Sequence, residues 1–389
     1  KPFALMAASL EEIRSHARVD PAAESVLASP EAPIVLLPRR ADSPIARSVA
    51  PGVGTFGFML CYTPLHHLLF DEGPAVLVAT SGNVSDEPLI CDHARAVERL
   101  GAVADAFLMH DREIYRQVDD SILHCVDGQP VLLRRARGFV PGPILMRDRC
   151  DRAILAAGAD LKNTFSLVKG DQIVCSEHIG DLEQAEVFQH YVRSIDHLRG
   201  LLDVEPEVVV CDLHPGYVST QYARRLTSSG VRIMEVQHHW AHVASVLAEH
   251  QIHGPVIGLV ADGTGYGTDG SIWGCECLIA SLERFERFGH MDTFPLAGGD
   301  RAAKEAIRPL TGLLMKAFGS DLSGCQWLLD RVEPDRAKQQ VLRQQLIQGV
   351  HLVRTSSLGR VFDAVAAIVG LGALNHFDAQ LPMALEAAV

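Results

Sequence analysis

The sequence lacks the features that would place the protein in a membrane or in an oxidising compartment. No apolar run approaches the roughly 18 residues of a membrane-spanning helix, and no charged segment followed by an apolar one marks a secretion signal. Its nine cysteines form no CxxC pair, and only Cys275 and Cys277 lie close together. Scattered cysteines in odd number indicate a reducing compartment and argue against cysteine-built zinc sites. We expect a cytoplasmic protein.

Positive charge is also scarce. The 35 Lys and Arg residues stand against 48 Asp and Glu residues, which gives a formal net charge of −13. A protein that holds a long phosphate backbone usually carries a basic surface, so this balance disfavours nucleic acid as a partner, although a few local groups suffice for a small anion. With 389 residues, 48% of them hydrophobic, the chain is globular and long enough for two domains.

The first domain is predicted over residues 1–143. Short apolar runs alternate there with helical patterns, which is typical of α/β structure. The predicted strands cover residues 3–7, 34–37, 75–80, 106–109 and 130–134, and the predicted helices cover residues 10–16, 64–69 and 92–100. Turn-forming residues end the domain, and residues 144–151 are predicted to be a linker.

The second domain is predicted over residues 152–389. Its predicted strands cover residues 154–157, 164–168, 173–177, 208–211 and 256–261, and its predicted helices cover residues 182–202 and 238–250. Two similar openings of strand, glycine turn and strand favour a duplicated α/β architecture of the actin or sugar-kinase kind. We expect both ends of the sequence to be cut, because it begins without an initiator Met and closes within a predicted helix that has no capping signal.

A candidate phosphate site lies in the first domain. The Thr-Ser-Gly-Asn turn at 80–83 follows a predicted strand, where backbone N–H groups and the side chains of Ser81 and Asn83 can donate to a phosphate. Paired aspartates at 119–120 suit Mg²⁺. Further donors that could hold a triphosphate are His110, Arg112, Arg116, Ser121 and Arg137. The alternatives are an ordinary turn with local hydrogen bonds and a surface network of ion pairs.

The strongest chemical signal is the Gln-His-His-Trp-Ala-His motif at 237–242. His238 and His242 are four residues apart, so on a helix they share one face and suit a single metal ion. His239 points about 100° away, which predicts a supporting or packing role. The apolar stripe on the other side of the helix consists of Val236, Trp240, Val243 and Leu247. The alternative is a polar helix face without a metal.

A third ligand is predicted where the strand 256–261 ends. Asp262 follows this strand directly and opens the glycine-rich segment 262–270. Because Gly263, Gly265 and Gly267 carry no side chain, the backbone there could approach an anionic ligand, and we predict that these glycines bind nucleotide. The segment lacks the Gly-Lys-Ser/Thr of a phosphate-binding P-loop and the helix of a dinucleotide fingerprint. A flexible hairpin turn is the alternative.

The motifs of both domains resemble the HypF family of hydrogenase-maturation carbamoyltransferases. Residues 1–143 look like the family's YrdC-like domain at 1–4, 60–69, 80–83, 110–121 and 134–141. Residues 152–389 look like its TsaD-like (universal Kae) domain at 158–164, 178–183, 212–220, 237–242, 262–270 and 362–367. The resemblance implies acylphosphatase-like and zinc-finger parts, and a Lys-x-Arg pair before Lys1. It also implies a further aspartate ligand and an adenine-binding motif after Val389.

The resemblance implies a reaction in two halves. The YrdC-like domain binds ATP with Mg²⁺ and forms carbamoyl-adenylate from carbamoyl phosphate and ATP, with the family's Ser-x-Asn pair at Ser81 and Asn83. The second domain holds one divalent metal ion, iron or zinc, on His238, His242 and Asp262. It passes the carbamoyl group to the C-terminal cysteine thiol of the partner HypE, as the precursor of the cyanide ligands of the nickel–iron centre.

Two alternatives stay open. A threonylcarbamoyl-type transferase acting on tRNA is built from the same domain types, but the net charge of −13 disfavours it. A non-catalytic nucleotide-binding scaffold would bind ATP without turnover. A metallopeptidase is poorly supported, because the motif at 237–242 lacks the glutamate of H-E-x-x-H.

Overall fold

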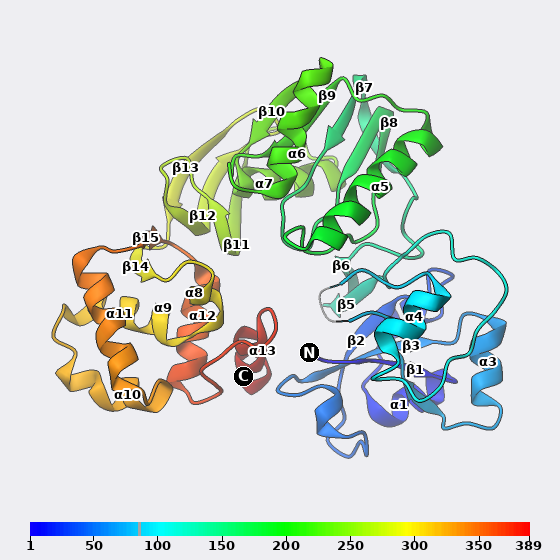
Figure 1. Ribbon diagram of the computed structural model, residues 1–389, viewed down its shortest axis with the longest axis horizontal. Coiled ribbons are helices and arrows are strands. Elements are labelled where there is room, and N and C mark those ends of the chain that lie inside the picture. The colour runs from blue at the N-terminus through cyan, green and yellow to red at the C-terminus, as the bar shows by residue number, and fades with distance from the viewer. Residues whose placement is uncertain (85–86) are drawn as a thin grey trace. The chain divides into compact units, whose positions relative to one another are not determined.

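The computed structural model describes residues 1–84 and 87–389 (Figure 1). It divides into two compact units. The N-terminal unit consists of residues 2–51 and 55–235. The C-terminal unit consists of residues 236–389 together with Lys1 and residues 52–54. None of the helices in the described part of the chain is long and apolar enough to cross a bilayer.

The N-terminal unit begins with a mixed six-stranded sheet in the order β4-β1-β3-β2-β5-β6. Its strands are β1 (Ala4–Ala7), β2 (Ile34–Pro38), β3 (Thr55–Leu60), β4 (Val76–Val78), β5 (Ile122–Val126) and β6 (Gln129–Arg134). The accompanying helices are α1 (Leu10–His16), α2 (Pro21–Leu27), α3 (Pro64–Phe70), α4 (His93–Leu100) and the short 3-10 helix Arg47–Val49. The β1–β3 and β2–β5 pairs are parallel, which agrees with the predicted α/β class.

The predictions for this sheet were wrong at one segment and incomplete at others. Residues 106–109 form no strand, because Leu108 and Met109 are exposed and their side chains find no sheet to pack on. Strands β3 and β5 and helix α2 were not predicted. The alternation that marks β3 is nevertheless present, since Phe56 and Phe58 on one face are fully buried.

A second sheet of the N-terminal unit has the order β10-β9-β7-β8. Its strands are β7 (Ile144–Ala156), β8 (Ser166–Cys175), β9 (Val208–Asp212) and β10 (Arg232–Val236), and its helices are α5 (Ala185–Leu202), α6 (Val218–Leu226) and the 3-10 helix Thr227–Ser229. Residues 144–151 are therefore part of β7 and not a linker, since Ile144 and Leu145 pair with Ile173 and Gln172. The strands predicted at 164–168 and 173–177 are one continuous strand.

The C-terminal unit is built on a sheet in the order β11-β12-β15-β14, with β13 paired to β12. Its strands are β11 (Val256–Tyr266), β12 (Ile272–Ala280), β13 (Phe285–His290), β14 (Phe294–Ala297) and β15 (Leu352–Thr355). Its helices are α7 (His238–Glu249), α8 (Arg301–Lys304), α9 (Ile307–Phe318), α10 (Gln326–Val332), α11 (Arg336–Gln348), α12 (Leu358–Ile368), α13 (Gln380–Ala388) and the 3-10 helix Ser323–Cys325. Helix α7 packs on β11 and β12 through Val243 and Leu247.

Strand β11 is longer than predicted. It continues through Asp262 to Tyr266 instead of ending at Ala261, and its pairing with β12 shifts register between Ala261 and Gly265. Such an irregularity in an antiparallel pair re-aims the side chains next to it. Asp262 therefore lies at a β-bulge inside the strand and not at its end.

Candidate metal centre

Helix α7 presents the two predicted metal-binding histidines on one face. The helix starts at His238 because the side chain of Gln237 accepts a hydrogen bond from the backbone N–H of Trp240 at 2.9 Å. The ring centroids of His238 and His242 lie 4.9 Å apart. His238 is half-buried and His242 is exposed, whereas Val243 is buried on the face that packs on the sheet.

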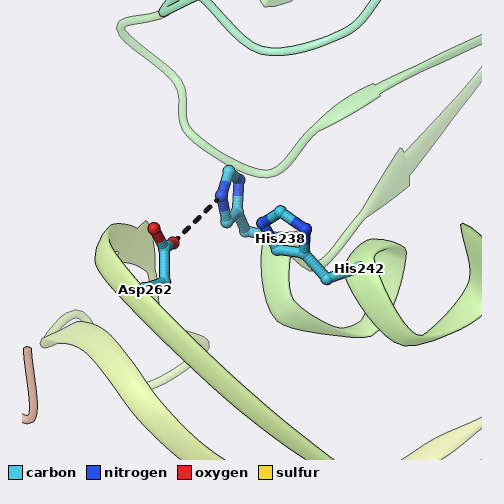
Figure 2. A group of neighbouring side chains, drawn as sticks. All are labelled: His238, His242 and Asp262. Carbon is cyan, nitrogen blue, oxygen red and sulfur yellow. Dashed lines mark ion pairs between the residues drawn. The ribbon is translucent and has the colours of Figure 1, made fainter. Parts of the chain in front are cut away.

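The bulge in β11 brings Asp262 to the same place. Its Oδ2 lies 3.3 Å from Nε2 of His238 (Figure 2), and its Oδ1 accepts a hydrogen bond from the Gly263 N–H at 2.6 Å. One ligand atom from each of His238, His242 and Asp262 lies within 4.8 Å of the other two. The structure thus brings together the three residues that the sequence proposed as ligands.

The chemistry of this triad fits a divalent metal. Two imidazoles and one carboxylate form a ligand set that zinc and iron accept. Oδ2 of Asp262 is buried and forms no hydrogen bond of regular geometry with the residues that the structure describes, although Nε2 of His238 faces it at 3.3 Å. Burial would raise the pKa of Asp262, but the neighbouring His238 and His242 and the Gly263 N–H hold it below its usual value, so the carboxylate is ionised at neutral pH.

His239 lies behind the triad and is fully buried. Burial lowers the pKa of His239 to about 4, against the opposing pull of Asp262, so this imidazole is neutral at physiological pH. Its Nδ1 lies 3.3 Å from Nε2 of Gln237, and its own Nε2 lies 3.6 Å from Oδ2 of Asp262. His239 therefore contacts the carboxylate from the protein interior.

Two of the three glycines predicted to bind nucleotide serve close packing in this structure. A Cβ on Gly265 would lie 2.3 Å from Cε1 of His239 and 2.9 Å from Cδ2 of His238. A Cβ on Gly267 would lie 2.2 Å from Nε1 of Trp273. The N–H of Gly267 donates to Ser271 and that of Gly263 donates to Asp262. Contact of these three glycines with a nucleotide remains a prediction from the glycine-rich sequence.

Several residues that sequence analysis missed support the centre. Ser357, the N-cap of α12, donates from its hydroxyl to the carbonyl of Gly263 at 2.6 Å. The buried ring of Trp273 packs against His239 with ring centroids 5.9 Å apart. Ser357 is 94 positions from Gly263 in the sequence. No local sequence pattern predicts a contact over such a separation.

In the N-terminal unit, the predicted phosphate turn is an exposed loop. The Ser81 hydroxyl donates to Oδ1 of Asn83 at 2.7 Å, and Nδ2 of Asn83 donates to the carbonyls of Glu87 at 2.7 Å and Val84 at 3.1 Å. His110 is exposed, with its ring 5.2 Å from that of His93, and Arg112 is exposed as well. Asn83 is thus engaged with backbone carbonyls of the protein and with Ser81.

The other three predicted nucleotide-binding side chains are engaged within the protein. Arg116 forms an ion pair with Glu177, whose side chain is buried. Arg137 donates to Asp120 at 2.9 Å and to the carbonyls of Glu31 and Ala32, and its guanidinium stacks 3.8 Å from the ring centre of Tyr62.

Ser121 is fully buried and joins the backbone on both sides of Arg137. Its hydroxyl oxygen accepts from the Ala136 N–H and its proton is donated to the Arg137 carbonyl, both at 2.8 Å. In this structure Ser121, Arg116 and Arg137 therefore bind groups of the protein itself.

Models of three protein families match consecutive parts of the chain. Residues 1–136 match a family that is described as telomere recombination and named after Sua5, YciO and YrdC. Residues 149–249 match the HypF Kae1-like domain. Residues 258–389 match the second subdomain of the carbamoyltransferase Kae1-like domain. The candidate triad is divided between the last two matches, with both histidines in the match to the HypF Kae1-like domain and Asp262 in the match to the second subdomain.

Similar proteins match over the whole chain. The carbamoyltransferase HypF of Rhizobium leguminosarum bv. viciae is 42% identical over 397 residues, which are 100% of this chain and 51% of that protein. A crystal structure of full-length HypF in the phosphate- and nucleotide-bound form has a TM-score of 0.95 at 40% identity and covers 100% of this chain and 50% of its own. The crystal structure of T. kodakarensis HypF has a TM-score of 0.93 at 37% identity, with 100% and 52% covered. The chain spans about half the length of the curated relatives it matches.

Proposed function

The chain belongs to the HypF carbamoyltransferase family, with a YrdC-like domain followed by a Kae1-like domain, and we propose that it catalyses ATP-dependent carbamoyl transfer in nickel–iron hydrogenase maturation. The YrdC-like part binds ATP with Mg²⁺, and carbamate derived from carbamoyl phosphate displaces pyrophosphate to give carbamoyl-adenylate. The Kae1-like part transfers the carbamoyl group to the C-terminal cysteine thiolate of HypE and releases AMP.

The observation that carries this proposal is the triad of His238, His242 and Asp262. Its ligand atoms lie within 4.8 Å of one another at the place where the two Kae1-like subdomain matches meet in sequence. A divalent metal bound there, iron or zinc, supplies a Lewis acid for the adenylate or its carbonyl. The nucleotide bound in the similar full-length HypF structure supports ATP as the second ligand.

Substrate choice distinguishes this function from transfer to tRNA. The full-length enzyme is incubated with ATP, carbamoyl phosphate carrying a carbon label, HypE and tRNA in one mixture. Because the chain carries a net charge of −13, we expect the label on HypE and none on tRNA. A HypE variant without its C-terminal cysteine is the control. Label on tRNA would favour the threonylcarbamoyl-type alternative, and nucleotide binding without any transfer would favour a scaffold.

Asn83→Ala is expected to weaken ATP binding. The change removes a side chain whose Nδ2 donates to the carbonyls of Glu87 and Val84 and which, in our proposal, turns to donate to a phosphate when ATP binds. A hydrogen bond to a charged group contributes about 1.5–3 kcal/mol, so calorimetry should show a loss of that size. Gln129→Ala, an exposed change on β6 of the same sheet, is the matched control. Equal ATP affinity of Asn83→Ala and the control would contradict the assignment of the turn.

A further inference from the structure

The side-chain amide of Gln237 has a fixed orientation in the structure. Its Oε1 accepts from the Trp240 N–H at 2.9 Å, so the Nε2 side is the donor. One Nε2 proton goes to the carbonyl of Tyr266 at 3.1 Å. The other faces Nδ1 of His239 at 3.3 Å. Swapping the amide oxygen and nitrogen would place a donor against the Trp240 N–H and an acceptor against the Tyr266 carbonyl.

This orientation determines the tautomer of His239. A ring nitrogen that accepts a hydrogen bond carries no proton, and a neutral imidazole carries one proton in all. The proton of His239 is therefore on Nε2. This atom lies 3.6 Å from Oδ2 of Asp262, an oxygen that Nε2 of His238 also faces at 3.3 Å. In the described part of the chain, neither Nε2 of His239 nor Oδ2 of Asp262 forms a hydrogen bond of regular geometry, and both atoms are buried. An N–H donor thus faces a carboxylate acceptor just beyond hydrogen-bond length.

We propose that His239 is a positioning residue of the metal centre, with Gln237 holding the Nε2–H of its imidazole toward Asp262. This inference rests on the proposed metal function and adds to it the group that orients the third ligand. A small rotation of the carboxylate closes the 3.6 Å gap to a hydrogen bond. Ligating carboxylates commonly receive such a bond from an outer partner, which fixes their direction.

The same tautomer excludes His239 as a fourth ligand. The lone pair of a neutral imidazole is on the unprotonated nitrogen, which here is Nδ1 and is occupied by Gln237. Gly265 fits this arrangement, because any side chain there would displace the His239 ring. Trp273 does not compete for the ring nitrogens, since its own Nε1 donates to Asp269 at 3.0 Å.

The tautomer can be measured directly on the metal-free protein. Nitrogen NMR of the full chain with labelled histidine distinguishes a protonated ring nitrogen from an unprotonated one, and the His239→Gln variant identifies the signal by its loss. We expect His239 to carry its proton on Nε2. A proton on Nδ1 would overturn the inference whether or not a metal binds.

Metal affinity tests whether His239 positions Asp262. Titration with Co²⁺, followed by its visible absorption, should show about 10- to 100-fold weaker binding in His239→Leu, the range for loss of an outer partner. His239→Gln retains a donor and should recover most of the affinity. His253→Gln, an exposed change just past α7, is the control. Thermal unfolding without metal checks that each variant is folded.

Gln237→Glu provides a test that keeps the His239 ring. Its carboxylate still accepts from the Trp240 N–H but can no longer donate to Nδ1, so the His239 proton should move to Nδ1 in the NMR spectrum. Affinity should then fall as in His239→Leu, even though the added negative charge favours a cation. Wild-type affinity in both variants would overturn the positioning role. Absence of Co²⁺ binding in the wild-type protein would instead overturn the proposed metal centre.

Discussion

His242→Ala is expected to abolish tight binding of a divalent metal to the chain. The change removes one of the three ligands whose donor atoms lie within 4.8 Å of one another, and alanine offers no replacement. Metal affinity should fall by more than the factor of about 10 to 100 that follows removal of an outer partner of a ligand. Because His242 is exposed and Val243 on the other face anchors α7, the helix itself should persist. Metal analysis after dialysis, together with Co²⁺ titration, measures the effect.

His250→Ala is the matched control for this experiment. His250 is an exposed histidine that caps the same helix and is not part of the triad. It should leave metal content unchanged. If His242→Ala keeps full metal occupancy while its circular dichroism matches that of the control, the histidines form only a polar helix face and the proposed centre is wrong.

Local patterns are sufficient to predict the helix that carries the two candidate metal ligands. The predicted helix 238–250 is confirmed as α7 (His238–Glu249), because histidines and apolar residues there repeat with the period of a helix. Helix α1 (Leu10–His16) is likewise predicted to the residue, since Ser9 caps it and its apolar positions recur at helical spacing. These elements depend on neighbours within one or two turns.

Elements whose ends depend on a partner strand are predicted less well. The strand at 256–261 was expected to stop before Asp262, but β11 runs on to Tyr266 because β12 supplies pairing for Gly265 and Tyr266. Residues 144–151 follow a run of turn-forming residues and were predicted to be a linker, yet Ile144 and Leu145 pair with β8 and the segment belongs to β7. A single sequence does not show which strand will pair with a given segment.

The roles of arginines are the hardest to predict from sequence. Arg137 sits in a basic cluster that suggests a phosphate ligand, but its donors reach carbonyls 105 and 106 positions away. Arg116 likewise pairs with Glu177, which is 61 positions away. Whether an arginine binds a ligand or protein carbonyls depends on the tertiary fold, because both offer the same acceptors to the guanidinium group.

Arg287→Leu is expected to lower the free energy of unfolding of the C-terminal unit by about 3–5 kcal/mol, because it leaves a buried carboxylate without its cation. The side chain of Glu276 on β12 is fully buried, and it accepts from Nε of Arg287 at 2.7 Å. The Gly274 N–H and the Ser356 hydroxyl also donate to Glu276. The same guanidinium stacks 3.9 Å from the ring centre of Trp273, which packs against His239.

Urea unfolding followed by tryptophan fluorescence measures this loss in the relevant unit. All three tryptophans of the chain lie within residues 236–389, so the signal reports the C-terminal unit. Adding Glu276→Gln to Arg287→Leu removes the buried charge and should recover part of the stability. If Arg287→Leu alone is as stable as the wild type, solvent reaches Glu276 and the prediction is wrong.

The pH dependence gives a second, independent signature of the Glu276–Arg287 pair. Burial alone would raise the pKa of Glu276, but Arg287 and Ser356 hold it below the usual 4.5, so the pair stabilises the wild type above pH 4.5 and this contribution is lost as pH falls through the lowered pKa. In Arg287→Leu, the pKa of Glu276 is set only by burial and by the neutral donors Ser356 and Gly274. The pKa of Glu276 then rises, and protonation at acidic pH relieves the penalty. The difference in unfolding free energy between the two proteins should therefore shrink toward acidic pH, whereas loss of packing alone would leave it constant.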